Sequence, residues 1–174
     1  MSELPGLGPP MTKEYKNLEG IGGWLLLVAL GIVVTPVKMI YGIYEIIQIF
    51  FDGSLDLLTS PASDRYIPGF GSYAVVETFV NCAFLAAWLY VAFLFFKKRA
   101  ALPRWYIGVL ASNAAFLCLD AFGYWYFFRS SPDYDLKPLL KEVVQTLVAS
   151  LIWIPYMCVS KRVGTTFVHP LSPQ

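Results

Sequence analysis

Four long apolar runs constrain this chain more than any other feature of its sequence. They cover about residues 20–51, 73–96, 105–128 and 139–159. Of the 174 residues, 57% are hydrophobic and only 14% are charged, against about 25% charged residues in ordinary soluble domains. An apolar helix of about 20 residues is long enough to cross a hydrocarbon core of about 30 Å. The sequence therefore predicts an all-α membrane protein with four transmembrane helices in a bundle.

Polar segments flank and separate these runs. Residues 1–19 are rich in Pro and Gly and predict a flexible tail, and residues 160–174 predict a second tail. Residues 52–72, rich in Asp, Ser, Pro and Gly, predict a loop. Pro36 predicts a kink in the first helix. The first run is too long for the apolar part of a signal peptide, so we expect it to be a retained helix.

The distribution of Lys and Arg predicts the orientation of the four helices. Eight basic residues lie in the two tails and the connection after the second helix, and three lie in the other two connections. Because basic residues accumulate in short cytoplasmic segments, we expect both termini to be cytoplasmic. The first group comprises Lys13, Lys16, Lys97, Lys98, Arg99, Arg104, Lys161 and Arg162, and the second comprises Arg65, Arg129 and Lys137.

Charged and amide side chains within the apolar runs gather, by helical rise, in the outer half of the predicted bundle. A charged residue at the centre of a transmembrane helix costs about 2.5–3.5 kcal/mol on insertion, so each one calls for an explanation. We expect Lys38, Glu77 and Asp120 to converge in a polar vestibule. A structural alternative is a buried ion-pair network that fixes the helix register. The candidate vestibule residues are Lys38, Glu45, Glu77, Asn81, Asp120, Glu142 and Gln145.

A second candidate surface lies on the cytoplasmic side. Basic residues after the second helix are expected at anionic lipid headgroups. The segment after the fourth helix has a more specific pattern than a basic stop signal needs, which indicates a docking surface. The candidate docking residues are Lys97, Lys98, Arg99, Ser160, Lys161, Arg162 and Thr166.

The sequence contains no pattern typical of catalysis or of a metal site. Cys82, Cys118 and Cys158 lie in three different apolar runs without CxxC spacing, and His169 is the only histidine. We therefore expect the cysteines to be small buried apolar side chains, and we expect no metal, no cofactor and no catalytic residue. The net charge of +1 gives no reason to expect a nucleic-acid partner.

Glycines at the start of the first helix do not form a phosphate-binding loop. Gly20, Gly22 and Gly23 lack the P-loop and dinucleotide-binding spacings, and no strand precedes them. They indicate close helix packing, which Gly31 would continue along the same helix.

Several segments together resemble a small bacterial inner-membrane family catalogued as domain of unknown function 2569. The resemblance covers about residues 18–168 and implies a four-helix protein of the bacterial inner membrane without an established activity. The segments that carry it are Gly20-Ile21-Gly22-Gly23-Trp24-Leu25, Glu77 with Asn81, Phe96-Lys97-Lys98-Arg99, Leu119-Asp120, Ile152-Trp153-Ile154-Pro155-Tyr156, Ser160-Lys161-Arg162-Val163 and Thr166-Phe167-Val168.

Three functions compete at this point. The first is a non-enzymatic membrane module that binds the bilayer and either lipid, a partner protein or a second copy of itself. The alternative is a small proton-linked transporter that uses Glu77 and Asp120, although no inverted repeat is visible. A lipid-modifying enzyme would need a nucleophile or metal that the sequence does not offer. A vestibule with a closed end favours binding, whereas a path past Asn113 to the cytoplasmic face favours transport.

Overall fold

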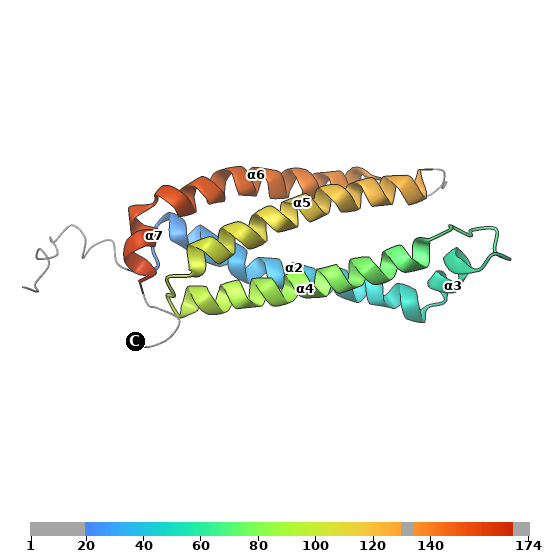
Figure 1. Ribbon diagram of the computed structural model, residues 1–174, viewed down its shortest axis with the longest axis horizontal. Coiled ribbons are helices and arrows are strands. Elements are labelled where there is room, and N and C mark those ends of the chain that lie inside the picture. Colours follow the sequence, from blue (N-terminus) through green and yellow to red (C-terminus); the bar gives the residue numbers. More distant parts are fainter. Residues whose placement is uncertain (1–19, 130–133, 169–174) are drawn as a thin grey trace, which may run out of the picture.

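The computed structural model describes residues 20–129 and 134–168, and this part of the chain is helical (Figure 1). Four of its helices are long and apolar enough to cross a membrane, with mean hydropathies between 1.4 and 2.1. The predicted N-terminal tail and the last six residues of the C-terminal tail lie outside the described residues. The helices are α2 (Trp24–Phe51), α3 (Ser54–Thr59), α4 (Phe70–Phe96), α5 (Leu102–Phe128), α6 (Lys137–Val159) and α7 (Lys161–Thr166).

The four long helices form two pairs that join at one end. Helix α2 packs on α4, α5 packs on α6, and α4 and α5 connect the pairs. In Figure 1 the pairs meet beside α7 and diverge toward α3. We call these two ends of the bundle the α7 end and the α3 end.

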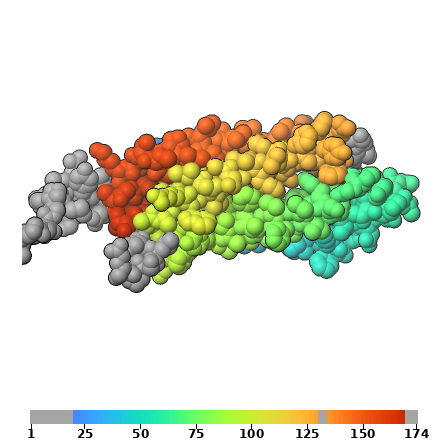
Figure 2. Space-filling view, in the orientation of Figure 1, coloured from blue at the N-terminus to red at the C-terminus, as the bar shows by residue number. Residues whose placement is uncertain are grey.

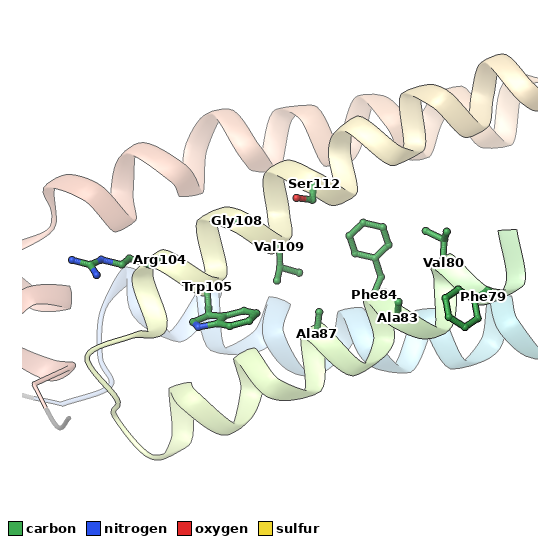
Figure 3. Close-up of a pocket in the computed structure, with 10 residues that line it drawn as sticks. All are labelled: Phe79, Val80, Ala83, Phe84, Ala87, Arg104, Trp105, Gly108, Val109 and Ser112. Carbon is green, nitrogen blue, oxygen red and sulfur yellow. The ribbon is translucent and has the colours of Figure 1, made fainter. Parts of the chain in front are cut away.

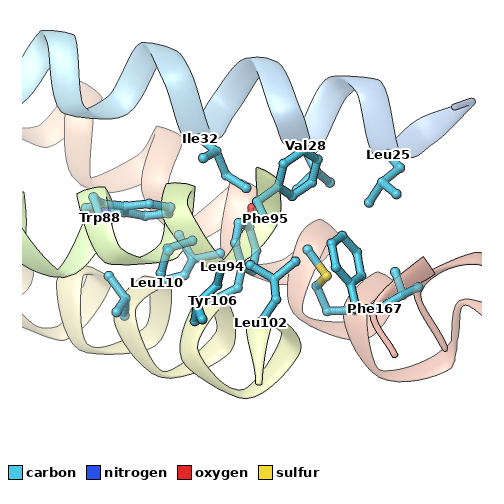
Figure 4. Packing of buried hydrophobic residues seen from close by; sticks show 14 residues of the cluster. Leu25, Val28, Ile32, Trp88, Leu94, Phe95, Leu102, Tyr106, Leu110 and Phe167 are labelled. Atoms are coloured by element: carbon cyan, nitrogen blue, oxygen red, sulfur yellow. The ribbon is translucent and has the colours of Figure 1, made fainter. Parts of the chain in front are cut away.

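The hydrophobic core lies at the α7 end, where all four long helices and α7 contribute side chains (Figure 4). Trp88 packs edge-on against Tyr106, and Phe95 lies against Phe167 with ring centroids 5.5 Å apart. Close packing of this kind is typical of a protein interior. The buried members are Leu25, Val28, Ile32, Trp88, Val91, Leu94, Phe95, Leu102, Tyr106, Val109, Leu110, Met157, Val163 and Phe167.

Three helices begin two or three residues earlier than the apolar pattern predicts, at Phe70, Leu102 and Lys137. Pro103 and Pro138 stand in the first turns of α5 and α6, where proline is tolerated because its missing N–H would have no helical partner. Helix α2 continues through Pro36, which is buried.

The predicted loop 52–72 contains a short helix, α3. Asp52 begins the turn before it by accepting a hydrogen bond from the backbone N–H of Ser54, at 2.8 Å. This bond favours the ionised carboxylate and lowers the pKa of Asp52 from its ordinary value.

The connection after α4 is a tight helix-ending turn. The backbone N–H of Arg99 donates to the carbonyl of Leu94, and that of Lys98 donates to the carbonyl of Phe95. This is the Schellman pattern, which places one residue in the left-handed conformation. Lys98 occupies that position with φ of 50°, where glycine would be more usual.

Two expectations about small residues are wrong. The three cysteines are exposed on the helix surfaces instead of buried. Gly31 is exposed too, and a Cβ added there would meet nothing within 4 Å. The physical reason is that the lipid-facing surface of a membrane helix is as apolar as its core, so apolar character does not predict burial.

Candidate functional site

A polar cavity of about 980 Å³ lies between the two helix pairs, and all four long helices line it. It contains every residue of the predicted vestibule. Asn113, Lys141 and Thr35 also line it. The vestibule residues are Lys38 and Glu45 from α2, Glu77 and Asn81 from α4, Asp120 from α5, and Glu142 and Gln145 from α6.

Two acids stand on the inner wall of the polar cavity, where α4 and α5 face each other. Glu77 and Asp120 are half-buried. They also line a smaller adjoining cavity of about 430 Å³, whose walls include several aromatic side chains near the α3 end. At about 1.5 Å of rise per residue, both acids lie about 10–12 Å from the α3 ends of their helices.

Tyr73 fixes the position of Asp120. Its hydroxyl donates to Oδ1 of Asp120 at 2.6 Å, across the contact between α4 and α5. Hydrogen bonds to a carboxylate are among the stronger ones in proteins. Tyr73 is not among the predicted vestibule residues, although its spacing of four from Glu77 and eight from Asn81 places it on the same helix face.

The two lysines of the polar cavity lie on α2 and α6. Lys38 and Lys141 are exposed, as are Glu45, Glu142 and Gln145. In the part of the chain that the structure describes, no ion pair joins Lys38 to Glu77 or Asp120. The alternative of a buried ion-pair network therefore has no support from Lys38.

The exposure of the lining residues indicates where the polar cavity opens. Helices α2 and α6 are neighbours, since the rings of Trp24 and Trp153 lie 6.5 Å apart, but the two helices make no extensive contact. The exposed lining residues come from these same two helices. We infer that the opening lies between α2 and α6, on the side that would face lipid.

The polar cavity ends at the core. Its lining reaches Thr35 on α2 and Asn113 on α5. One turn further toward the α7 end, Ile32 and Leu110 are buried in the apolar core. The cavity is therefore closed on the side of α7.

The candidate docking residues gather at the α7 end, but they differ in exposure. Lys97, Lys98 and Lys161 are exposed. Thr166 is only 3% exposed and donates a hydrogen bond to the carbonyl of Gly20 at 3.3 Å. Its side chain is therefore part of the fold, and a docking role for this surface stays a prediction.

The other candidate docking residues are less accessible than these lysines. Arg99 and Arg162 are half-buried. The Arg162 guanidinium lies over Gly22, where an added Cβ would be 2.8 Å from one of its nitrogens. The Ser160 side chain accepts a hydrogen bond from the N–H of Val163 at the start of α7.

A separate hollow of about 570 Å³ lies between α4 and α5, near the middle of the bundle (Figure 3). Phe79, Phe84 and Val109 give it apolar walls, and Arg104 is its one charged lining residue. Figure 2 views the molecule with α4 and α5 toward the reader. The hollow contains no nucleophile paired with a base, and within the described residues no three His, Cys, Asp or Glu side chains are placed to hold a metal ion.

The fold defines the class of protein to which this chain belongs. This is an all-α protein with four helices suited to crossing a membrane, which suggests a multi-pass membrane protein. The chain belongs to the family described as protein of unknown function DUF2569, which it matches over residues 18–168. The resemblance noted in the sequence is thereby confirmed. No curated protein and no solved structure matches this chain.

Proposed function

We propose that this protein is a multi-pass protein of the bacterial inner membrane that binds a lipid headgroup in its polar cavity and catalyses no reaction. The polar cavity itself carries the proposal. Charged side chains within transmembrane helices are costly, and here nine charged or amide residues from four helices share one space. An opening between α2 and α6 would admit a headgroup while its acyl chains stay in the bilayer.

The closed end of the polar cavity favours binding over transport. A carrier that uses Glu77 and Asp120 would need a path past Ile32 and Leu110, and both are buried in the core. The transporter remains the alternative, because the two acids line both cavities and the Tyr73 hydroxyl could relay a proton to Asp120. That alternative requires the core to open during each cycle.

In the orientation that we propose, both termini and the α7 end face the cytoplasm. The eight-to-three distribution of basic residues supports this orientation. Exposed Lys97, Lys98 and Lys161 would then lie at anionic headgroups of the inner leaflet, each contributing about 1 kcal/mol of attraction. The same basic end could receive a partner protein.

Filling the polar cavity tests lipid binding directly. Gly42 lines the cavity, and a Cβ added there meets nothing within 4 Å. We expect Gly42→Leu to fold normally but to retain fewer lipid molecules, counted by native mass spectrometry after transfer from nanodiscs into mild detergent. Gly31→Leu on the same helix is the matched control, because Gly31 also has open space but lies outside the cavity. Equal retention by the two variants would contradict the proposal.

A further inference from the structure

The polar cavity has a surplus of acids, and two of the acids lie on helices that contribute no lysine to the lining. Its lining contains four carboxyl groups and two lysines. Such a site favours a ligand that carries a positive charge. The acids are Glu45, Glu77, Asp120 and Glu142, and the lysines are Lys38 and Lys141.

Among the described residues of α4 and α5 that form the inner wall, no basic side chain is present to balance the two acids. Glu77 and Asp120 are half-buried and face the same space. Two carboxylates in one site of low dielectric repel each other when both are ionised, unless a positive charge lies between them. Tyr73 supplies Asp120 with a hydrogen bond but no charge. A ligand cation on this wall would satisfy both acids.

Hydrogen-bond acceptors on the same wall favour a primary ammonium group. Asn81 uses its amide nitrogen to donate to the carbonyl of Glu77 at 3.0 Å, and this bond leaves its side-chain oxygen uninvolved. A primary ammonium has three N–H donors, and the carboxylates and amide oxygens of this wall are acceptors. A quaternary ammonium has no N–H donor and would leave these acceptors without a hydrogen bond.

The two lysines lie near the opening of the polar cavity. The phosphate of a bound headgroup would stay there when its ammonium reaches the inner wall. Lys38 on α2 and Lys141 on α6 are exposed on the two helices that flank the opening. Glu45 and Glu142 are exposed on the same two helices, so the opening carries acids beside its lysines, whereas the inner wall carries acids alone. An ammonium on the inner wall and a phosphate at the lysines then give the ligand one orientation. A glycerophospholipid has its phosphate between the headgroup amine and the acyl chains, which matches this order.

We propose that the polar cavity selects a zwitterionic phospholipid whose headgroup joins a primary ammonium to a phosphodiester. The ammonium contacts Glu77 and Asp120, and the phosphate lies between Lys38 and Lys141. This inference rests on the proposed function, namely that the cavity binds a lipid headgroup.

A competition between two lipids tests the inference on the full-length protein. In nanodiscs of phosphatidylethanolamine and phosphatidylglycerol in equal amounts, the wild-type protein should retain phosphatidylethanolamine in preference. Because hydrogen bonds to charged groups are strong, replacing both acids, with Glu77→Gln and Asp120→Asn, should lower this preference at least about tenfold. Asp56→Asn, an exposed acid of α3 outside the cavity, is the control and should change nothing.

The lysines give the second arm of this experiment. Lys38→Met should weaken retention of both lipids, because both have a phosphate, and should leave the preference between them unchanged. Preference of the wild-type protein for phosphatidylglycerol, lost in Lys38→Met and Gly42→Leu, would overturn the inference while the proposed function stands. If Gly42→Leu changes the retention of no lipid, both fail.

Lipid analogues keep the inference testable even if the acid variants do not fold. The wild-type protein should retain phosphatidylethanolamine more than its N-methylated forms and more than phosphatidylcholine. Equal retention of phosphatidylcholine would overturn the primary-ammonium assignment. Soluble phosphoethanolamine should compete poorly because it has no acyl chains, and tight competition by it would overturn the lipid as the source of the headgroup.

Discussion

The contact between Tyr73 and Gly123 determines how Asp120 is held. The Tyr73 ring lies against Gly123 on α5, so closely that an added Cβ would be 2.8 Å from ring carbon Cε2. The hydroxyl of the same ring donates to Asp120, three residues before Gly123. A glycine at this position therefore allows the aromatic ring to reach the acid on the neighbouring helix.

We expect Gly123→Ala to shift the Tyr73 ring and to disturb its hydrogen bond to Asp120. Overpacking of this kind costs about 1–3 kcal/mol, measurable as a loss in the free energy of unfolding in an SDS titration. Gly108→Ala, on the same helix, is the control, since an added Cβ there meets nothing within 4 Å. If the two variants are equally stable, the ring does not depend on Gly123.

At the scale of elements, α7 closes the end of the bundle. Val163 and Phe167 are spaced by four residues and are both buried in the core, where the Phe167 ring lies beside Phe95. The hydrogen bond from Thr166 to Gly20 joins the segment to the residues just before α2. The part of the predicted C-terminal tail that the structure describes is therefore integral to the fold.

Removing the buried ring should test this role. Phe167 is 5% exposed and its neighbour Val168 is 57% exposed. We expect Phe167→Ala to lower the free energy of unfolding by about 3–5 kcal/mol. Val168→Ala should change it by less than about 0.5 kcal/mol. Similar small effects for both would mean that α7 does not stabilise the bundle and serves only as a surface.

At the scale of the whole molecule, the orientation in the membrane decides which leaflet would supply the lipid that we propose as the ligand. With the α7 end in the cytoplasm, the polar cavity lies in the periplasmic half of the bilayer. We expect a reporter that is active only outside the cytoplasm to stay silent when fused after Gln174. The same reporter inserted after Ala62, in the connection between α3 and α4, should be active. The reverse pattern would invert the proposed topology.

The sequence predicts the four helices and the residues of the polar cavity well, because both depend on rules that act along one helix. A charged residue such as Asp120 cannot face lipid at low cost, and helical rise then gives its level. Contacts between helices follow no such rule. The bond from Tyr73 to Asp120 depends on how α4 and α5 cross, and the burial of Phe167 depends on how α7 folds back. The predicted burial of Cys82 is wrong because lipid tolerates the same side chains as a protein core.

The opening that we infer between α2 and α6 has a consequence for how the proposed lipid binding is measured. A ligand that enters from the bilayer moves by diffusion in two dimensions, so its supply is set by its mole fraction in one leaflet. Diluting the membranes in buffer would then leave occupancy unchanged, whereas adding a second, unrecognised lipid to the same bilayer would lower it. For the lipid ligand that we propose, the natural unit of affinity is therefore a mole percentage of lipid.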